Sequence, residues 1–253
     1  MKSEIQTALA TVLLAAGDDE LILGQRNSEW CGQAPILEED IAFANLALDE
    51  LGHAGLWYSL LAQLTGERPS YADRLVYFRK ARDFRNIQMV ELPNGDWAFS
   101  MLRQFLFDAY EGVRLEALTR SRYTPLAEAA AKIRKEEMYH FRHSQAWIRR
   151  LGLGTPESHQ RTQTALQLLW PYTHQLFVSQ PGEDQLVEAG ILPPGLDVQA
   201  SWAERVLACL DDCGLEAPIT NEASLSREQH TPAFFVLVAE MQSVARLDTS
   251  AEW

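Results

Sequence analysis

The sequence has few cysteines, no long apolar run and no stretch of alternating apolar and polar residues. Its three cysteines are Cys31, Cys209 and Cys213, and a sparse, odd number argues against a disulfide framework and for a reducing compartment. Cys209 and Cys213 lie four residues apart, and because two thiols alone make a poor metal site we expect them in the core. No run reaches the roughly 18 apolar residues of a transmembrane helix. The missing strand-like alternation argues against a β-sheet.

Basic residues are also scarce relative to acidic ones. The chain carries 22 Lys and Arg against 35 Asp and Glu, a formal net charge of −13. A negative field over the whole chain repels phosphate, which argues against a nucleic-acid partner. The apolar run 7–16 near the N-terminus is short and is followed by acidic residues, unlike a secretory signal with a small-residue cleavage site. The sequence therefore predicts a cytoplasmic location, with neither a targeting segment nor a membrane partner.

What the sequence does contain is helical periodicity, with helix-breaking residues between the periodic segments. Gly66, the segment 93–95, Thr124-Pro125 and Gly152 are typical of helix ends and starts. The sequence predicts an all-α fold with a single domain over 1–253. Four core helices are expected at about 3–25, 36–65, 97–121 and 125–151, and additional helices at about 70–90, 156–178, 199–213 and 232–247. The segment 180–198 is expected to be loop with a short turn of helix.

Ionisable residues interrupt the apolar faces of the four long helices. An amphipathic helix buries residues at i, i+3, i+4 and i+7, and burying an unpaired charge there is costly. Two helices carry Glu-x-x-His, whose side chains at i and i+3 share one face and can reach one metal ion. Carboxylates on two helices and Glu-x-x-His on two others are typical of di-iron and di-manganese bundles. The sequence therefore predicts a metal site formed by Glu20, Glu50, His53, Asp108, Glu137 and His140.

The positions of the four carboxylates agree with two helical hairpins. Glu20 and Glu50 are each 15 residues from Pro35, which lies in an expected turn, or about 22 Å at 1.5 Å per residue. Asp108 and Glu137 are equally far from the point between residues 122 and 123, just before the next helix start. Both hairpins thus place their ligands at one level, and stacking them gives a single cluster. A second interpretation stays open, in which the residues form a hydrogen-bonded core network after the loss of a metal site.

Charged residues near this set are expected to have other roles. Glu111 is expected on the helix surface or beside the ligands, and His143 in a supporting or core position. Asp49 is expected to face away from Glu50 and to order the neighbouring helix, and Glu136 to be exposed. The basic run is expected to form a solvated helix face and consists of Arg79, Lys80, Arg82 and Arg85.

Several long segments resemble one known family. They are QRNSEWCGQAPILEEDIAFANLALDELGHA at 25–54, VELPNGDWAF at 90–99, KEEMYHFRHSQAWIRRLGLGT at 135–155 and HTPAFFVLVAEMQ at 230–242. In these segments the chain resembles the C subunits of the bacterial phenylacetyl-CoA epoxidases (the PaaC family), which belong to the ferritin-like superfamily. The resemblance implies a four-helix bundle with additional helices in a cytoplasmic, hetero-oligomeric monooxygenase of phenylacetate catabolism. It also implies pairing with a homologous catalytic A subunit that holds a di-iron centre, and with further subunits that supply electrons from NADPH.

The C subunits of this family are regarded as structural, with a degenerate metal site. This sequence departs from that pattern, because all six predicted ligands are present. Two interpretations follow. The chain is a structural partner of the catalytic subunit, or it is a di-iron or manganese oxygenase subunit in its own right. The sequence assigns no catalytic residue and no further cofactor. An iron-storage function is disfavoured by the long additional helices.

Overall fold

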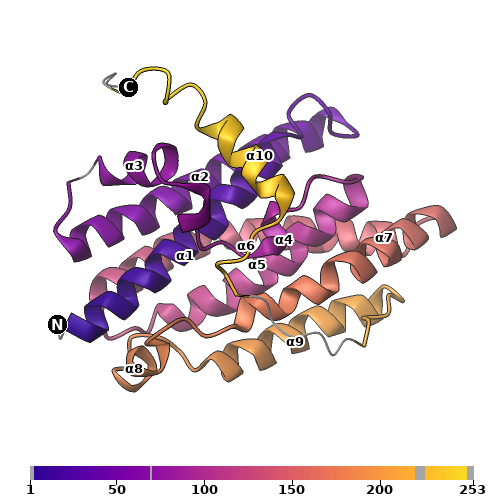
Figure 1. Ribbon diagram of the computed structural model, residues 1–253. Coiled ribbons are helices and arrows are strands. Elements are labelled where there is room, and N and C mark those ends of the chain that lie inside the picture. Colours follow the sequence, from indigo (N-terminus) through magenta and orange to yellow (C-terminus); the bar gives the residue numbers. More distant parts are fainter. Residues whose placement is uncertain (1–2, 69, 220–225, 250–253) are drawn as a thin grey trace.

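Four long helices form the centre of the molecule. The computed structural model describes residues 3–68, 70–219 and 226–249, and every regular element in these ranges is a helix. The long helices are α1 (Ser3–Ser28), α2 (Leu37–Thr65), α5 (Trp97–Leu118) and α6 (Thr124–Gly152). Helix α1 packs along α2 and α5 along α6, so that two hairpins build the bundle (Figure 1). The prediction of an all-α, ferritin-like four-helix bundle with additional helices is confirmed.

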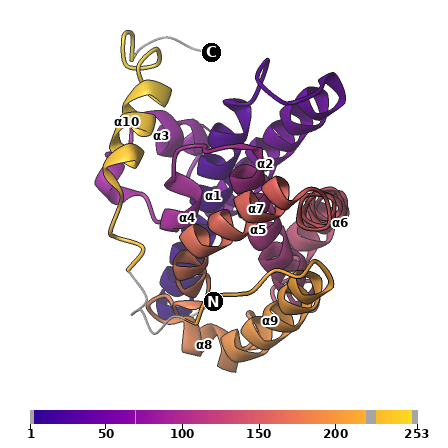
Figure 2. The same cartoon turned by 90° about the vertical axis from the view of Figure 1, so that its right-hand side faces the viewer.

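Shorter helices cover the bundle from several sides. They are α3 (Tyr71–Tyr77), α4 (Gln88–Glu91), α7 (Pro156–Leu169), α8 (Glu183–Glu188), α9 (Gly195–Asp212) and α10 (Pro232–Met241), with 3₁₀ segments at Ala81–Asp83 and Trp170–Phe177. Figure 2 shows α3 and α10 on one side of the bundle and α6 at the opposite edge. No helix of the described residues has the length and apolarity that crossing a membrane requires.

Local signals fix several helix ends. The Asp96 side chain accepts a hydrogen bond from the Phe99 N–H at the start of α5, and Thr155 caps α7 in the same way. Such caps satisfy backbone N–H groups that have no partner inside the helix. Helix α2 ends at Gly66, which has φ = 75°, a left-handed conformation that glycine adopts at no steric cost.

The prediction of one continuous helix at 70–90 is wrong. The segment contains α3, a 3₁₀ turn and α4, separated by irregular chain. The reason is a tertiary interaction. The carboxylate of Asp18 binds the Arg79 guanidinium and accepts the Arg85 backbone N–H at 2.6 Å. A continuous helix would use that N–H internally. The solvated helix face predicted for this basic run is therefore wrong for Arg79, which is mostly buried, although Lys80 and Arg82 are exposed.

Other differences concern helix ends. The helix predicted at 156–178 is α-helical only to Leu169 and continues as a 3₁₀ segment, because Pro171 has no N–H and its ring blocks the preceding turn. Helix α9 begins four residues before the predicted start at 199, whereas α8 agrees with the short turn of helix predicted within the loop 180–198. Helix α10 ends at Met241, six residues before the predicted end at 247, and Gln242 then donates to the Val76 and Arg79 carbonyls. Both Cys209 and Cys213 are buried, as predicted.

Gly17 allows α1 and α2 to approach closely, and we expect Gly17→Ala to destabilise the protein. A Cβ at position 17 would lie 2.5 Å from Cε1 of Tyr58. The Tyr58 ring is buried and its hydroxyl donates to Asp18 at 2.6 Å, so it has little room to move. Overpacking of this kind costs about 1–3 kcal/mol, measurable as a lower midpoint of urea unfolding.

Gly55→Ala in α2 is the matched control. A Cβ at position 55 meets no atom within 4 Å, and alanine in place of glycine inside a helix stabilises by about 0.5–1 kcal/mol. The two variants should therefore shift the unfolding midpoint in opposite directions. Equal shifts would contradict the close α1–α2 packing as the cause.

Candidate metal centre

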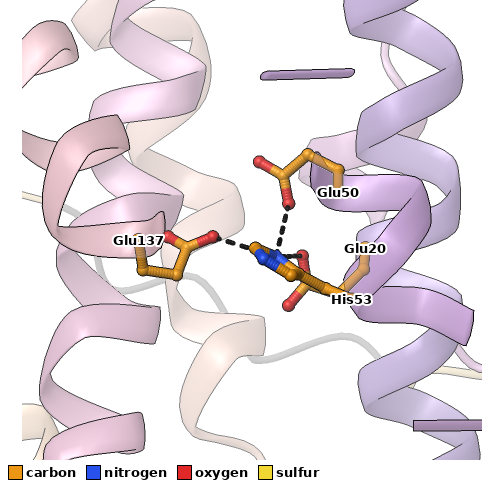
Figure 3. A group of neighbouring side chains, drawn as sticks. All are labelled: Glu20, Glu50, His53 and Glu137. Atoms are coloured by element: carbon orange, nitrogen blue, oxygen red, sulfur yellow. Dashed lines mark ion pairs between the residues drawn. The ribbon is translucent and has the colours of Figure 1, made fainter. Parts of the chain in front are cut away.

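The structure brings all six predicted ligands together in the middle of the bundle. Their ligand atoms form two groups in which every atom lies within 4.8 Å of the others. One group contains Glu20, Glu50, His53 and Glu137, and the other contains Glu50, Asp108 and His140. Glu50 belongs to both groups, so they form one continuous cluster. Figure 3 shows the side chains of the first group pointing toward one another from opposite sides of the bundle.

The two histidines turn the same ring nitrogen toward the cluster. Nδ1 of His53 lies 3.3 Å from Glu137 and 3.7 Å from Glu20. Nδ1 of His140 lies 3.0 Å from Glu137 and 3.6 Å from Glu50. The i and i+3 spacing of each Glu-x-x-His thus produces the shared helix face expected from the sequence.

The other ring nitrogen of each histidine contacts a carboxylate on the opposite helix. Nε2 of His53 in α2 lies 2.8 Å from Glu136 in α6. Nε2 of His140 in α6 lies 3.2 Å from Asp49 in α2. The arrangement is reciprocal, because each acid directly precedes the glutamate of one motif and contacts the histidine of the other. Metal-binding histidines usually donate their second N–H to a carboxylate, which fixes the ring and its tautomer.

Asp49 contacts His140 in the neighbouring helix α6, and its role in ordering that helix stays a prediction. Glu136 is exposed, as predicted, although its contact with His53 is not evident from the sequence. His143 contacts Glu39 at 2.7 Å, a supporting contact outside the cluster. Glu111 is buried and bound to Arg114, so a surface position for Glu111 is wrong.

Several polar atoms of the cluster have no hydrogen-bond partner among the described residues. Both carboxylate oxygens of Glu20 are in this state, together with one oxygen each of Glu50 and Glu137 and Nδ1 of His53. Leaving a buried polar atom unsatisfied costs about 1–3 kcal/mol, and native proteins avoid it except where a ligand, ion or water completes the bonding. These atoms all belong to the groups that face one another at the centre.

Neutral polar side chains hold the remaining carboxylate oxygens. Nε2 of Gln104 donates to Glu50 at 2.8 Å and to Asp108 at 2.6 Å. The Ser144 hydroxyl donates to the other oxygen of Asp108 at 2.6 Å. Gln104 thereby links two carboxylates from different helices, and Asn27 in turn donates to its side-chain oxygen at 2.8 Å. The sequence did not identify these supports, because a glutamine or serine on a helix face carries no distinctive spacing.

The carboxylates of the metal-free cluster compete for protons. Burial, together with the Glu50 carboxylate, raises the pKa of Glu20 well above its usual value. Burial and the charge of Glu137 raise the pKa of Asp108 in the same way. Burial also opposes ionisation of Glu50, but its neighbours Glu20 and His140 lower its pKa to about 2. Without a cation, this cluster therefore keeps protons on part of its carboxyl groups.

The cluster has the composition of a metal site. Its ligand atoms are carboxylate oxygens and imidazole nitrogens, which suit iron and manganese. Four ionised carboxylates and two neutral imidazoles carry four negative charges, which two divalent cations would balance. A buried cluster of uncompensated charge is otherwise costly. The residues present therefore fit a metal ion on donor type, charge and unsatisfied atoms.

Two further acids, next to Glu20 in the sequence, bind elsewhere. Asp18 binds Tyr58, Arg79 and the Arg85 N–H. Asp19 accepts the Ile87 N–H at 2.7 Å and forms an ion pair with Arg227 at 2.8 Å. All three consecutive acids are buried, and they connect α1 to three different parts of the molecule. No spacing rule singles out Asp18 and Asp19 in the sequence.

Comparison with known proteins agrees with this architecture. The family described as phenylacetic acid catabolic protein (PaaA_PaaC) matches residues 1–253. The C subunit of the 1,2-phenylacetyl-CoA epoxidase of Escherichia coli K12 is 37% identical over 247 residues, covering 97% of this chain and 99% of that protein. The A subunit of the same enzyme is 28% identical over 141 residues, covering 56% of this chain and 44% of that protein.

Proposed function

This chain belongs to the phenylacetic acid catabolic protein family, and from that premise we propose that it is the C-type subunit of a multicomponent phenylacetyl-CoA 1,2-epoxidase. In this role it is the structural partner of a homologous A-type subunit. The observation that carries the proposal is similarity to a C subunit over nearly the full length of both chains. The weaker similarity to an A subunit supports a common origin of the two partners. A cytoplasmic location stays a prediction from the sequence.

The complete cluster favours a second candidate function, that of a di-iron or manganese oxygenase subunit in its own right. Its six residues have the donor set for two metal ions, Glu50 and Glu137 lying between the two histidines. Two iron or manganese ions held there would supply the redox chemistry with which carboxylate-bridged centres activate O₂. The residues of this chain would fix the ligands, through Gln104, Asp49 and Glu136, and exclude bulk water by their burial. In a structural subunit the same metals would instead contribute to folding stability.

We propose that the partner subunit binds to the outer surfaces of α2 and α6. Large apolar side chains lie exposed there, in part beside the contacts Asp49–His140 and Glu136–His53. They are Leu37 (70% exposed), Ile41 (56%), Leu48 (66%), Met138 (40%) and Tyr139 (72%). Several such residues on two neighbouring helices are typical of a protein interface. We call them the α2–α6 surface.

Replacing two residues of the α2–α6 surface should prevent the subunits from pairing. When the chain is co-expressed with an A-type subunit, we expect the two to co-purify and to support turnover of phenylacetyl-CoA together. Ile41→Glu with Leu48→Glu places two charges where apolar side chains meet the partner, and desolvating them costs several kcal/mol. Co-purification should then fall below detection, measured by affinity capture and size-exclusion chromatography.

The control is a pair of substitutions at exposed apolar residues away from this surface, Leu168→Glu with Val236→Glu. This variant should still co-purify. Loss of pairing in both variants would point to general destabilisation, which thermal unfolding of the isolated chain would reveal. Failure of the unaltered chain to associate with the A-type subunit would contradict the proposed function itself.

A further inference from the structure

A cavity lined by both polar and apolar side chains lies away from the carboxylate cluster. It has a volume of about 70 Å³ and lies between α1, α5, the 3₁₀ segment 170–177 and the start of α9. Its apolar wall includes Val12, Ala15, Leu176 and Val198. At roughly 10–15 Å³ per water molecule the cavity has room for about five to seven waters, and so for a small organic molecule.

Two arginines line this cavity, and each uses only part of its hydrogen-bonding capacity. Nη1 of Arg227 donates to both oxygens of Asp19 and to the Arg85 carbonyl. Its Nε has no hydrogen-bond partner among the described residues, although the side chain is only 7% exposed. A guanidinium has five N–H donors and no acceptor, and Nε of Arg227 is a buried donor for which the described residues provide no acceptor.

Arg114 faces the same cavity from α5. Its Nη1 donates to both oxygens of Glu111, at 2.8 and 3.2 Å, and these are its only hydrogen bonds within the described part of the chain. The guanidinium lies 5.6 Å from the Trp57 ring and 5.9 Å from the Tyr110 ring, contacts that hold it in position without using its N–H groups. Arg114, too, therefore has donors left for a ligand.

The two guanidinium groups also act on each other. Burial lowers the pKa of Arg227, but Asp19 and Tyr110 together raise it above its usual value, and the positive charge of Arg114 opposes that rise. Both arginines line one cavity, where Asp19 acts favourably on each of them, and a further anion between them would reduce their repulsion. Asp19 already accepts from Nη1 of Arg227 and from the Ile87 N–H, so a ligand would use the other N–H groups of Arg227. Glu183 at the cavity accepts the Gln180 N–H at 2.6 Å.

We propose that this cavity binds a short-chain monocarboxylate, with its carboxylate between Arg114 and Arg227 and its alkyl chain against the wall that includes Val12 and Ala15. Arginine is suited to this task because its planar fork matches the two oxygens of a carboxylate. The apolar wall selects for a hydrocarbon body over a fully hydrated anion such as phosphate. The site is independent of the metal cluster, whose six residues do not line it.

Calorimetric titration of the full chain with sodium propionate tests the proposal. We expect saturable binding with a millimolar dissociation constant, since a ligand with so few atoms has limited contact energy. Propionamide has the same shape without the charge, and it should bind at least about tenfold more weakly because charge-assisted hydrogen bonds are lost. Inorganic phosphate should also bind more weakly than propionate, because it cannot use the apolar wall.

Two variants locate the binding. Arg114→Met should abolish propionate binding, and Ala15→Leu should do so by filling the cavity without altering a charge. Arg205→Met is the control, since Arg205 lies exposed on α9 and does not line this cavity. Equal binding of propionate and propionamide would overturn the proposal. So would unchanged binding in a folded Ala15→Leu variant, or no binding by the unaltered chain.

Discussion

A Glu50→Gln variant should be purified without bound iron or manganese, whereas the unaltered chain should carry up to two such ions. Glu50 is the residue that both ligand groups share, so its loss removes a donor from each. It is fully buried and held by Gln104, which leaves a substitute residue no freedom to compensate. The measurement is elemental analysis by mass spectrometry of protein expressed with its partner subunit in medium that contains both metals.

Glu39→Gln is the matched control for Glu50→Gln. Glu39 lies on the same helix and also contacts a histidine, His143, at 2.7 Å, but it is outside the cluster. This variant should keep its metal. If the unaltered chain contained no transition metal under these conditions, the interpretation as a metal-free hydrogen-bonded network would replace that of a metal centre.

The same Glu50→Gln variant separates the two candidate functions. In the assembled complex, turnover of phenylacetyl-CoA should persist when this chain loses its metal, because the structural-partner proposal assigns catalysis to the A-type subunit. Complete loss of turnover in a complex that still assembles would instead assign the chemistry to this chain. Assembly is measured on the same preparation, so a failure of pairing is not mistaken for a loss of catalysis.

Arg227→Met should lower the free energy of unfolding by roughly 3–5 kcal/mol, the cost of leaving one member of a buried ion pair uncompensated. Arg227 is almost fully buried and donates to both oxygens of Asp19, and methionine has a similar length without the charge. Equilibrium unfolding in urea, followed by circular dichroism, measures the difference.

Two comparisons make this test specific. The double variant Asp19→Asn with Arg227→Met should be more stable than Arg227→Met alone, because no unpaired charge is then left in the interior. Arg149→Met removes an arginine from an exposed ion pair with Asp212, and exposed pairs contribute little. If Arg227→Met lowered the free energy of unfolding by no more than Arg149→Met does, the result would contradict the importance of the buried pair.

The long helices were predictable because their signals are local. Apolar periodicity and breakers such as Gly66 and Pro125 act within a few residues, so the bounds of α2 and α6 agree with the prediction to within a residue or two. The segment 70–90 was not predictable in this way. Its course depends on Asp18, whose bonds to Arg79 and Arg85 span more than 60 positions. Periodicity in a single segment contains no information about such a partner.

The same distinction holds for the site. The prediction that six residues from four helices lie together is confirmed, because equal spacing from the two turns fixes their height in the bundle. That they hold metal stays a prediction. Gln104 and Ser144, which bind the carboxylates, were not predicted, since neutral polar residues are common on helices for many reasons. The exposed Glu136 was correctly expected at the surface, yet its contact with His53 depends on how α2 and α6 face each other.

The ion pair between Asp19 and Arg227 joins positions 208 residues apart. At a synthesis rate of about 5–20 residues per second, Arg227 is added to the chain roughly 10–40 s after Asp19. During that interval Asp19 lacks the partner that binds both of its carboxylate oxygens in the complete chain. A truncation near the C-terminus that removes Arg227 would then first affect the packing around Asp19, near the N-terminus.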